Sequence, residues 1–244
     1  NGATASDVAG NQSSITSIEV MNNPNYLVDT KLPEVLISSD VSALKANETA
    51  TITFTFSEDP GTSFVWDGAS GDLIVSGGTL SAIAGFGLTR SATFTPTASG
   101  ATTIDVASGA FTDTAGNNNT AATQFNWTYD GTAPTMAITA SEVSDGDTSN
   151  DGTLSLTFTS SESTSNFVVG DITVNGGALS SFAGSGTTYT ATFTPSGDGA
   201  TTIDVNANTF TDAVGNNNTA ATQFNWTYDS TAPTMIIAAA EITD

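Results

Sequence analysis

Carboxylates are the groups through which this sequence could do chemistry. Its 244 residues include 25 Asp and Glu against three Lys and Arg, and they include no His and no Cys. Without imidazole or thiol groups there is no histidine general base, no cysteine nucleophile and no typical zinc or copper site. A formal net charge of −22 repels phosphate and anionic lipid, so nucleic acid and membrane surfaces are poor partners. Binding of a hard cation by oxygen ligands is the chemistry that remains.

The acidic residues recur with a fixed spacing. Asp113 begins the sequence Asp-Thr-Ala-Gly-Asn, and Asp212 begins Asp-Ala-Val-Gly-Asn 99 residues later. The surrounding stretches 101–136 and 200–235 differ at only seven of 36 positions. A catalytic pair of acids needs a cleft and has no reason to recur with every unit of a repeat. We therefore expect a structural role for these acids and no enzymatic activity.

The internal repeat divides the chain into four parts. Two complete units are expected at 33–131 and 132–230. Residues 1–32 are expected to be the C-terminal part of a preceding unit, and residues 231–244 the start of a following one, because both ends carry fragments of the same motifs. The sequence thus predicts a slice of a longer tandem array. No run approaches 18 apolar residues, so no membrane insertion is expected in this segment.

Apolar and polar residues alternate with a period of two within each unit. The alternation is clear in residues 50–56, where Ile and Phe alternate with Thr, and in residues 123–129, where Phe, Trp and Tyr alternate with polar residues. About seven short strands in about 100 residues predict an all-β fold of tandem Ig-like antiparallel sandwiches. Such units in series would form an elongated rod. In the first unit the strands are expected near 35–39, 50–56, 63–66, 72–76, 89–96, 101–107 and 123–129.

Several longer strings carry a family resemblance. They include TFTFSE, LIVSGGTLS, SATFTPT and TTIDVASGAFTDTAGNNNTAA, and the most specific are the Asp-x-Ala-Gly-Asn loop at 113–117 and the Asp-x-Thr-Ala-Pro junction at 130–134. Over essentially its whole length the chain resembles the bacterial Ig-like repeats that build the stalks of giant adhesins and other long surface proteins. The resemblance implies an extracellular, cell-surface protein, commonly stiffened by calcium. It implies no activity.

The sandwich topology brings particular loops to the same end of each unit. The chain enters there, and the B–C and F–G loops return to it, so three carboxylates and an amide are expected to meet. These oxygens suit Ca²⁺, which takes 6–8 oxygen ligands, and no Lys or Arg is expected nearby to offset the repulsion. Asp and Asn that merely cap turns are the alternative. The candidate calcium ligands are Asp29, Glu58, Asp113 and Asn117 in the first unit, and Asp130, Glu162, Asp212 and Asn216 in the second.

A further group of acids lies at the opposite end of the second unit. It starts like an EF-hand loop, but Leu156 occupies the position that needs a bidentate Glu. These acids could instead contribute to a cation site that faces the next unit, although a solvated polar loop is the simpler interpretation. The first unit has Lys45 in this loop, so the junctions are not all equal. The residues concerned are Asp145, Asp147 and Asp151, together with Asp198 and Asp229.

The leading hypothesis is a structural segment of a long extracellular stalk or fibre, with Ca²⁺ at the junctions and neighbouring repeats of the same chain as its partners. Two alternatives remain open. In one, the repeats themselves recognise a glycan or a cell surface. Trp66 is its candidate contact, because its counterpart in the second unit is not aromatic, whereas Trp127 and Trp226 recur as expected core residues. In the other, copies of the chain assemble into a polymeric filament through strand edges.

Overall fold

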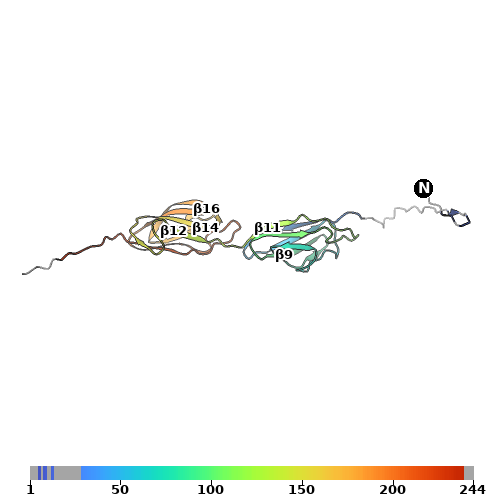
Figure 1. Ribbon diagram of the computed structural model, residues 1–244, viewed down its shortest axis with the longest axis horizontal. Helices are drawn as coiled ribbons and strands as arrows, with labels where there is room; N and C mark the ends of the chain where they lie inside the picture. Colours follow the sequence, from blue (N-terminus) through green and yellow to red (C-terminus); the bar gives the residue numbers. More distant parts are fainter. Residues whose placement is uncertain (1–4, 7, 10–11, 14–28, 239–244) are drawn as a thin grey trace, which may run out of the picture.

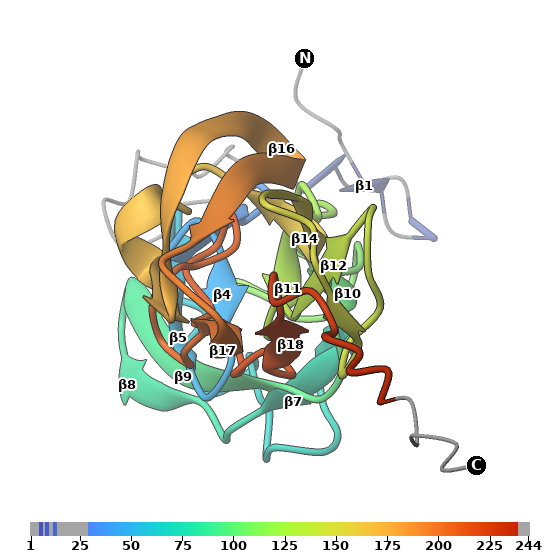
Figure 2. The ribbon, with the colours of Figure 1, turned by 90° about the vertical axis from the view of Figure 1, so that its left-hand side faces the viewer.

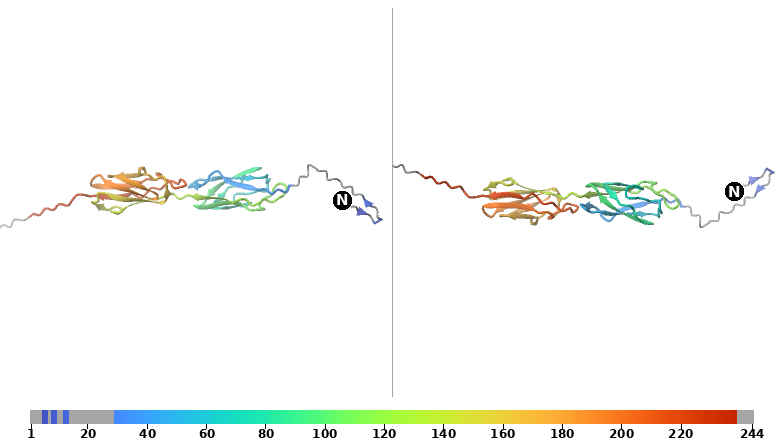
Figure 3. Two further views of the ribbon diagram at one scale, coloured as in Figure 1. Left: turned by 90° about the horizontal axis from the view of Figure 1, so that it is seen from above. Right: turned by 90° about the horizontal axis from the view of Figure 1, so that it is seen from below.

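The computed structural model describes residues 5–6, 8–9, 12–13 and 29–238. Two β-sandwiches lie end to end along the long axis (Figure 1), and the views from above and below agree on this arrangement (Figure 3). Most of the expected partial unit at 1–32 and the last six residues of the chain lie outside the described residues. Of the former, only a two-stranded pair of β1 (Ala5–Ser6) and β2 (Gln12–Ser13) and residues 8–9 and 29–32 are described.

The first sandwich consists of two sheets. One sheet has the order β3-β5-β9-β7, with β8 also paired to β9, and the other has the order β4-β11-β10-β6. All neighbours are antiparallel except β4 and β11, which are parallel. The strands are β3 (Val35–Ser39), β4 (Leu44–Lys45), β5 (Ala50–Phe56), β6 (Leu73–Ser76), β7 (Gly78–Leu80), β8 (Ala84–Phe86), β9 (Thr89–Pro96), β10 (Gly100–Val106) and β11 (Phe125–Asp130).

The second sandwich repeats this topology. Its sheets have the orders β12-β14-β16 and β13-β18-β17-β15, and the long β16 covers the span of β7, β8 and β9. A 3₁₀ turn, η1 (Val169–Asp171), precedes β15. In the view along the long axis the two sandwiches project over one another (Figure 2). The strands are β12 (Met136–Ala140), β13 (Thr148–Ser149), β14 (Leu154–Thr164), β15 (Ile172–Asn175), β16 (Gly177–Pro195), β17 (Gly199–Val205) and β18 (Phe224–Tyr228).

Alternation in the sequence produces the two inner faces. Along β5 the residues alternate between buried apolar and more exposed Thr side chains, as expected for a sandwich strand with one apolar face. Trp127 and Trp226 are buried and confirm their assignment to the core. Each sandwich has its own hydrophobic core. The all-β prediction of tandem Ig-like sandwiches is therefore confirmed.

Two expectations for the first unit are corrected. Residues 63–66 form no strand, and Trp66 makes only an isolated bridge to Gly71, because a short turn inserted at 67–70 brings the chain straight back. Trp66 is also not a free surface residue. It packs against the core, and its indole N–H donates to the carbonyl of Leu80 at 3.2 Å.

The connection between the sandwiches is short. β11 ends at Asp130 and β12 begins at Met136, so the linker between the two units is only residues 131–135. Residues 231–238 lead away from the far end of the second sandwich (Figure 1). No helix among the described residues is long and apolar enough to span a membrane.

Candidate metal centre

Two clusters of three carboxylates lie at corresponding ends of the two units. The first cluster is Asp29, Glu58 and Asp113, and the second cluster is Asp130, Glu162 and Asp212. In each cluster one oxygen of every carboxylate lies within 4.8 Å of the others. The structure therefore brings together all six acids that the sequence analysis assigned to these two sites.

The second cluster draws its acids from both sandwiches. Asp130 is the last residue of β11, which belongs to a sheet of the first sandwich. Glu162 lies in β14, and Asp212 lies in the loop between β17 and β18, so both belong to the second sandwich. The cluster consequently sits across the boundary between the units.

Each buried Asp of the clusters is held by the turn that it begins. Oδ1 of Asp212 accepts hydrogen bonds from the backbone N–H groups of Val214, Gly215 and Asn216 at 2.7–2.9 Å. Gly215 has a φ of +94°, a conformation that favours glycine. Turn capping, the alternative explanation of this motif, is thus present, and it also fixes the carboxylate in place.

The side-chain amides of Asn117 and Asn216 turn their N–H groups, not their oxygens, toward the clusters. Nδ2 of Asn216 donates to Oδ2 of Asp212 at 2.8 Å and to the carbonyl of Asp130 at 2.7 Å. Nδ2 of Asn117 makes the equivalent bonds, at 2.8 Å to Oδ2 of Asp113 and at 3.1 Å to the carbonyl of Asp29. In this arrangement the asparagines orient the cluster instead of supplying it with an amide oxygen.

Charge and burial act differently on the two clusters. In the second, burial and then the charges of Asp130 and Asp212 raise the pKa of Glu162. In the first, burial opposes ionisation of Asp113, but hydrogen bonds from the side chain and backbone of Asn117 and from neighbouring N–H groups outweigh it and lower the pKa of Asp113. The environment therefore disfavours the charged form of Glu162 in the second cluster and favours the charged form of Asp113 in the first.

A lysine beside the first cluster contradicts the expectation that no basic residue lies near these sites. Nζ of Lys31 lies 3.7 Å from Oε1 of Glu58. The second unit has Thr132 at the corresponding position, two residues after its cluster aspartate. Among the described residues, no Lys or Arg forms an ion pair with the second cluster. The first cluster therefore carries an ion pair that the second lacks, while the ammonium group of Lys45 lies 3.4 Å from the carbonyl of Gly215 in the loop of Asp212.

The acids at the other end of the second unit cap turns and the exit segment. Asp198 accepts from the hydroxyl of Thr231 and from the hydroxyl and N–H of Ser230, and these bonds lower the pKa of Asp198. Within the described part of the chain, these acids do not gather into a group of three ligand atoms. The carboxylates of the other four acids also accept hydrogen bonds: Asp145 from Asn225, Asp147 from Ser144, Asp151 from Ser149, and Asp229 from Thr231.

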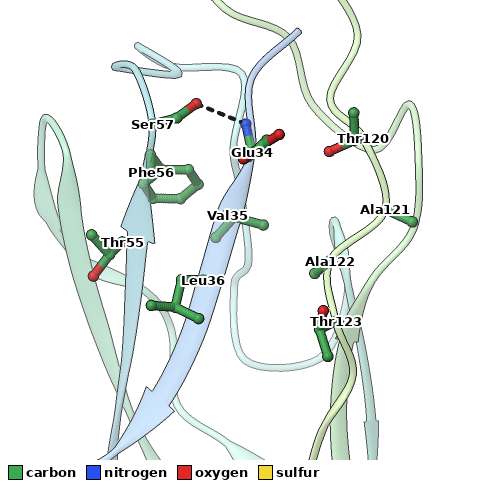
Figure 4. Close-up of a pocket in the computed structure, with 10 residues that line it drawn as sticks. All are labelled: Glu34, Val35, Leu36, Thr55, Phe56, Ser57, Thr120, Ala121, Ala122 and Thr123. Atoms are coloured by element: carbon green, nitrogen blue, oxygen red, sulfur yellow. Dashed lines mark hydrogen bonds between the residues drawn. The ribbon is translucent and has the colours of Figure 1, made fainter.

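A groove of about 520 Å³ runs beside β3 of the first sandwich. It lies between β3 and the segment 120–123, and Glu34 is the one ionisable residue that lines it (Figure 4). The N–H of Glu34 donates to Oγ of Ser57. The groove thus offers one solitary carboxylate and no second acid or base to pair with it.

The family model of the bacterial Ig-like domain matches the sequence twice, over residues 29–129 and 130–228. The chain belongs to the bacterial Ig-like domain family. Both matched ranges begin at the aspartate that opens a cluster, Asp29 or Asp130. The clusters therefore lie where one family unit gives way to the next. No curated protein matches this sequence.

Several solved structures align with most of this chain at low sequence identity. Invasin, a bacterial integrin-binding protein, is 16% identical with a TM-score of 0.47, and the match covers 80% of this chain and 41% of that one. FdeC, an adhesin of Escherichia coli, is 20% identical with a TM-score of 0.44, covering 79% and 63%. InvD of Yersinia pseudotuberculosis is 19% identical with a TM-score of 0.37, covering 88% and 64%. This chain spans less than two thirds of the length of each of these proteins.

Proposed function

We propose that this chain is a structural segment of an extracellular, adhesin-like stalk, and that Ca²⁺ bound at the unit boundaries stiffens it. The observation that carries the proposal is the second cluster, in which three carboxylates meet with no basic side chain paired to them. Tandem Ig-like units in a chain with a formal charge of −22 suit a spacer that repels its neighbours.

Repulsion within the second cluster supports a cation there. At an effective dielectric constant of about 20, two unit charges within 4.8 Å repel by about 3 kcal/mol or more. Neutralisation by a divalent ion removes this cost. Ca²⁺ prefers carboxylate and carbonyl oxygens and tolerates irregular geometry, so the donor set fits it better than it fits a nitrogen- or sulfur-preferring metal.

An ion in the second cluster would stiffen the joint because its ligands come from both sandwiches. Asp130 is tied to the first sandwich by β11, whereas Glu162 and Asp212 are tied to the second by β14 and the loop after β17. An ion that binds all three restrains the short connection at 131–135. The joint would then resist bending more strongly with calcium than without it.

Calcium titration tests this proposal. We expect calcium to raise the melting temperature and narrow the range of end-to-end dimensions seen by small-angle scattering, relative to chelator. Glu162→Gln removes one ligand charge and weakens both responses. Glu34→Gln makes the same charge change at an exposed residue outside the clusters and leaves them intact. Identical melting and scattering curves with calcium and chelator would refute the metal-stiffened joint.

The glycan-binding alternative has little support from the residue that suggested it. Trp66 packs against the core, and its N–H group is already bonded to the carbonyl of Leu80. A sugar-stacking role would need this ring to leave its contacts. We therefore retain the structural role as the proposal.

A further inference from the structure

The two units also touch beside the second cluster, through groups other than its three carboxylates. The turn that follows β4 in the first sandwich reaches the loop after β17 in the second, 170 residues away in sequence. The N–H of Ala46 donates to Oδ1 of Asn216 at 2.8 Å. Nζ of Lys45 lies 3.4 Å from the carbonyl of Gly215. These contacts join one unit directly to the next.

Asn216 is the centre of this contact. It is 4% exposed, and it bonds to three separate segments. Its nitrogen donates to Asp212 in its own loop and to the carbonyl of Asp130 in β11, while its oxygen accepts from Ala46. An amide is needed here because it donates and accepts at once, whereas an ionised aspartate of the same shape only accepts.

The conformation of the turn after β4 is fixed by contacts within its own unit. β4 pairs in parallel with the end of β11, with Lys45 opposite Asp130, so the turn stands beside the strand that leaves the unit. Within the turn, the N–H of Glu48 donates to the carbonyl of Lys45 at 3.1 Å, and Asn47 adopts a φ of +65°. The N–H of Ala46 is consequently presented by a fixed backbone rather than by a mobile side chain.

We propose that the turn after β4 is a docking surface for the Asp-x-x-Gly-Asn loop of the following unit, and that Asn216 fixes the angle between the units without a metal. The partner is another unit of this repeat that carries asparagine at the end of that loop. This inference goes beyond the calcium-stiffened joint, because the bonds concerned are formed by backbone and amide groups that need no cation.

The corresponding turn of the second unit differs in its side chains and in the bonding of its backbone. Ser149 lies opposite Tyr228 as Leu44 lies opposite Tyr129, which places Asn150 and Asp151 at the positions of Lys45 and Ala46. The N–H of Asp151, at the position of Ala46, donates to Oγ of Ser149 at 3.3 Å. The lysine is replaced by an asparagine, so the turns of successive units differ at both contact positions.

Distance measurements between spin labels test the docking. The chain has no cysteine, so Thr95→Cys and Thr194→Cys give one label in each sandwich. In chelator we expect a narrow distance distribution for the parent protein and loss of that narrow distribution in Asn216→Ala. Asn117→Ala removes the equivalent bonds in the first unit, outside the labelled joint, and is expected to leave the distribution unchanged.

A second variant distinguishes loss of the docking bond from disruption of the loop at 212–216 by Asn216→Ala. Ala46→Pro removes the donor N–H from the other side of the contact and should broaden the distribution as well. Asp151→Pro makes the same change at the corresponding position of the turn that faces away from the joint and should leave the distribution narrow. A broad distribution for the parent in chelator that narrows with calcium would overturn the docking and leave the metal joint standing. A narrow distribution that survives both Asn216→Ala and Ala46→Pro would also overturn it. A narrow distribution in chelator that calcium does not change would support the docking and count against the metal.

Discussion

Ionisation of Glu162 opposes folding. Burial and two neighbouring carboxylates raise its pKa above the ordinary value of 4.5, so this group favours the folded state only while it is protonated. That contribution is present below pH 4.5 and is lost as the pH rises through the raised pKa. In chelator at pH 7 we therefore expect Glu162→Gln to raise the melting temperature of the second unit.

Calorimetry over a pH series checks the sign of this effect. The advantage of Glu162→Gln over the parent should shrink as the pH falls below 4.5, because both side chains are then neutral. In calcium the order should reverse, because the variant has lost a ligand. An advantage that is constant across the pH range would contradict this account of Glu162.

Lys31 supplies a second prediction at the residue scale. Its ammonium group lies beside Glu58 in the first cluster, whereas Thr132 occupies the same place in the second. We expect Thr132→Lys to weaken calcium binding at the second cluster by up to about fivefold, since exposed ion pairs contribute about 0.2–1 kcal/mol. Lys31→Thr should strengthen the first site to a similar extent. Isothermal titration calorimetry of the two exchanges measures both affinities. Stronger binding in Thr132→Lys, weaker binding in Lys31→Thr, or a change in the same direction in both would refute the role given to Lys31.

At the scale of elements, a turn glycine and a strand glycine have different reasons to resist substitution: backbone conformation in one and close packing in the other. Gly116 has a φ of +92°, and an added Cβ would meet no atom within 4 Å. At Gly78, by contrast, an added Cβ would lie 2.3 Å from the ring of Phe94 and 2.5 Å from the carbonyl of Thr95. We expect Gly116→Ala to cost about 1–2 kcal/mol. Gly78→Ala should cost more, because the ring and a strand must both move. Urea unfolding of the two variants ranks them.

The alternation of apolar and polar residues predicted most of the strands, but it did not predict the contacts between the two units. The buried and exposed residues of β5 follow the alternation in its sequence because a strand turns successive side chains to opposite faces. The acids of the clusters were also predictable, since sandwich topology determines which loops meet. The turn contact from Ala46 to Asn216 was not, because it depends on the rotation between two units, which no pattern within one unit encodes. The ion pair of Lys31 with Glu58 was also missed, although Lys31 lies only two residues after the predicted ligand Asp29.

At the scale of the whole molecule, separate cores make the units separable in stability. Each sandwich buries its own aromatic and aliphatic residues, and the chain passes between the two cores only through residues 131–135. Repeat proteins of this kind gain stability nearly additively from their units and interfaces. We expect a fragment beginning at residue 129 to keep the calcium response of the second unit, and a fragment beginning at residue 132 to lose it with Asp130. Thermal melts of the two fragments check this, and equal responses would show that Asp130 is not required.

The parallel pairing of β4 with β11 bears on how the chain carries tension. The chain passes through each sandwich from one end to the other (Figure 1), so a pull on its ends draws β11 lengthwise past β4. The hydrogen bonds that join Leu44 and Lys45 to Tyr129 and Asp130 are then loaded in shear and must break together, not one after another. β13 and β18 repeat the arrangement in the second unit. Each sandwich thus has a pair of parallel strands, next to its C-terminal end, that resists tension through hydrogen bonds loaded in shear.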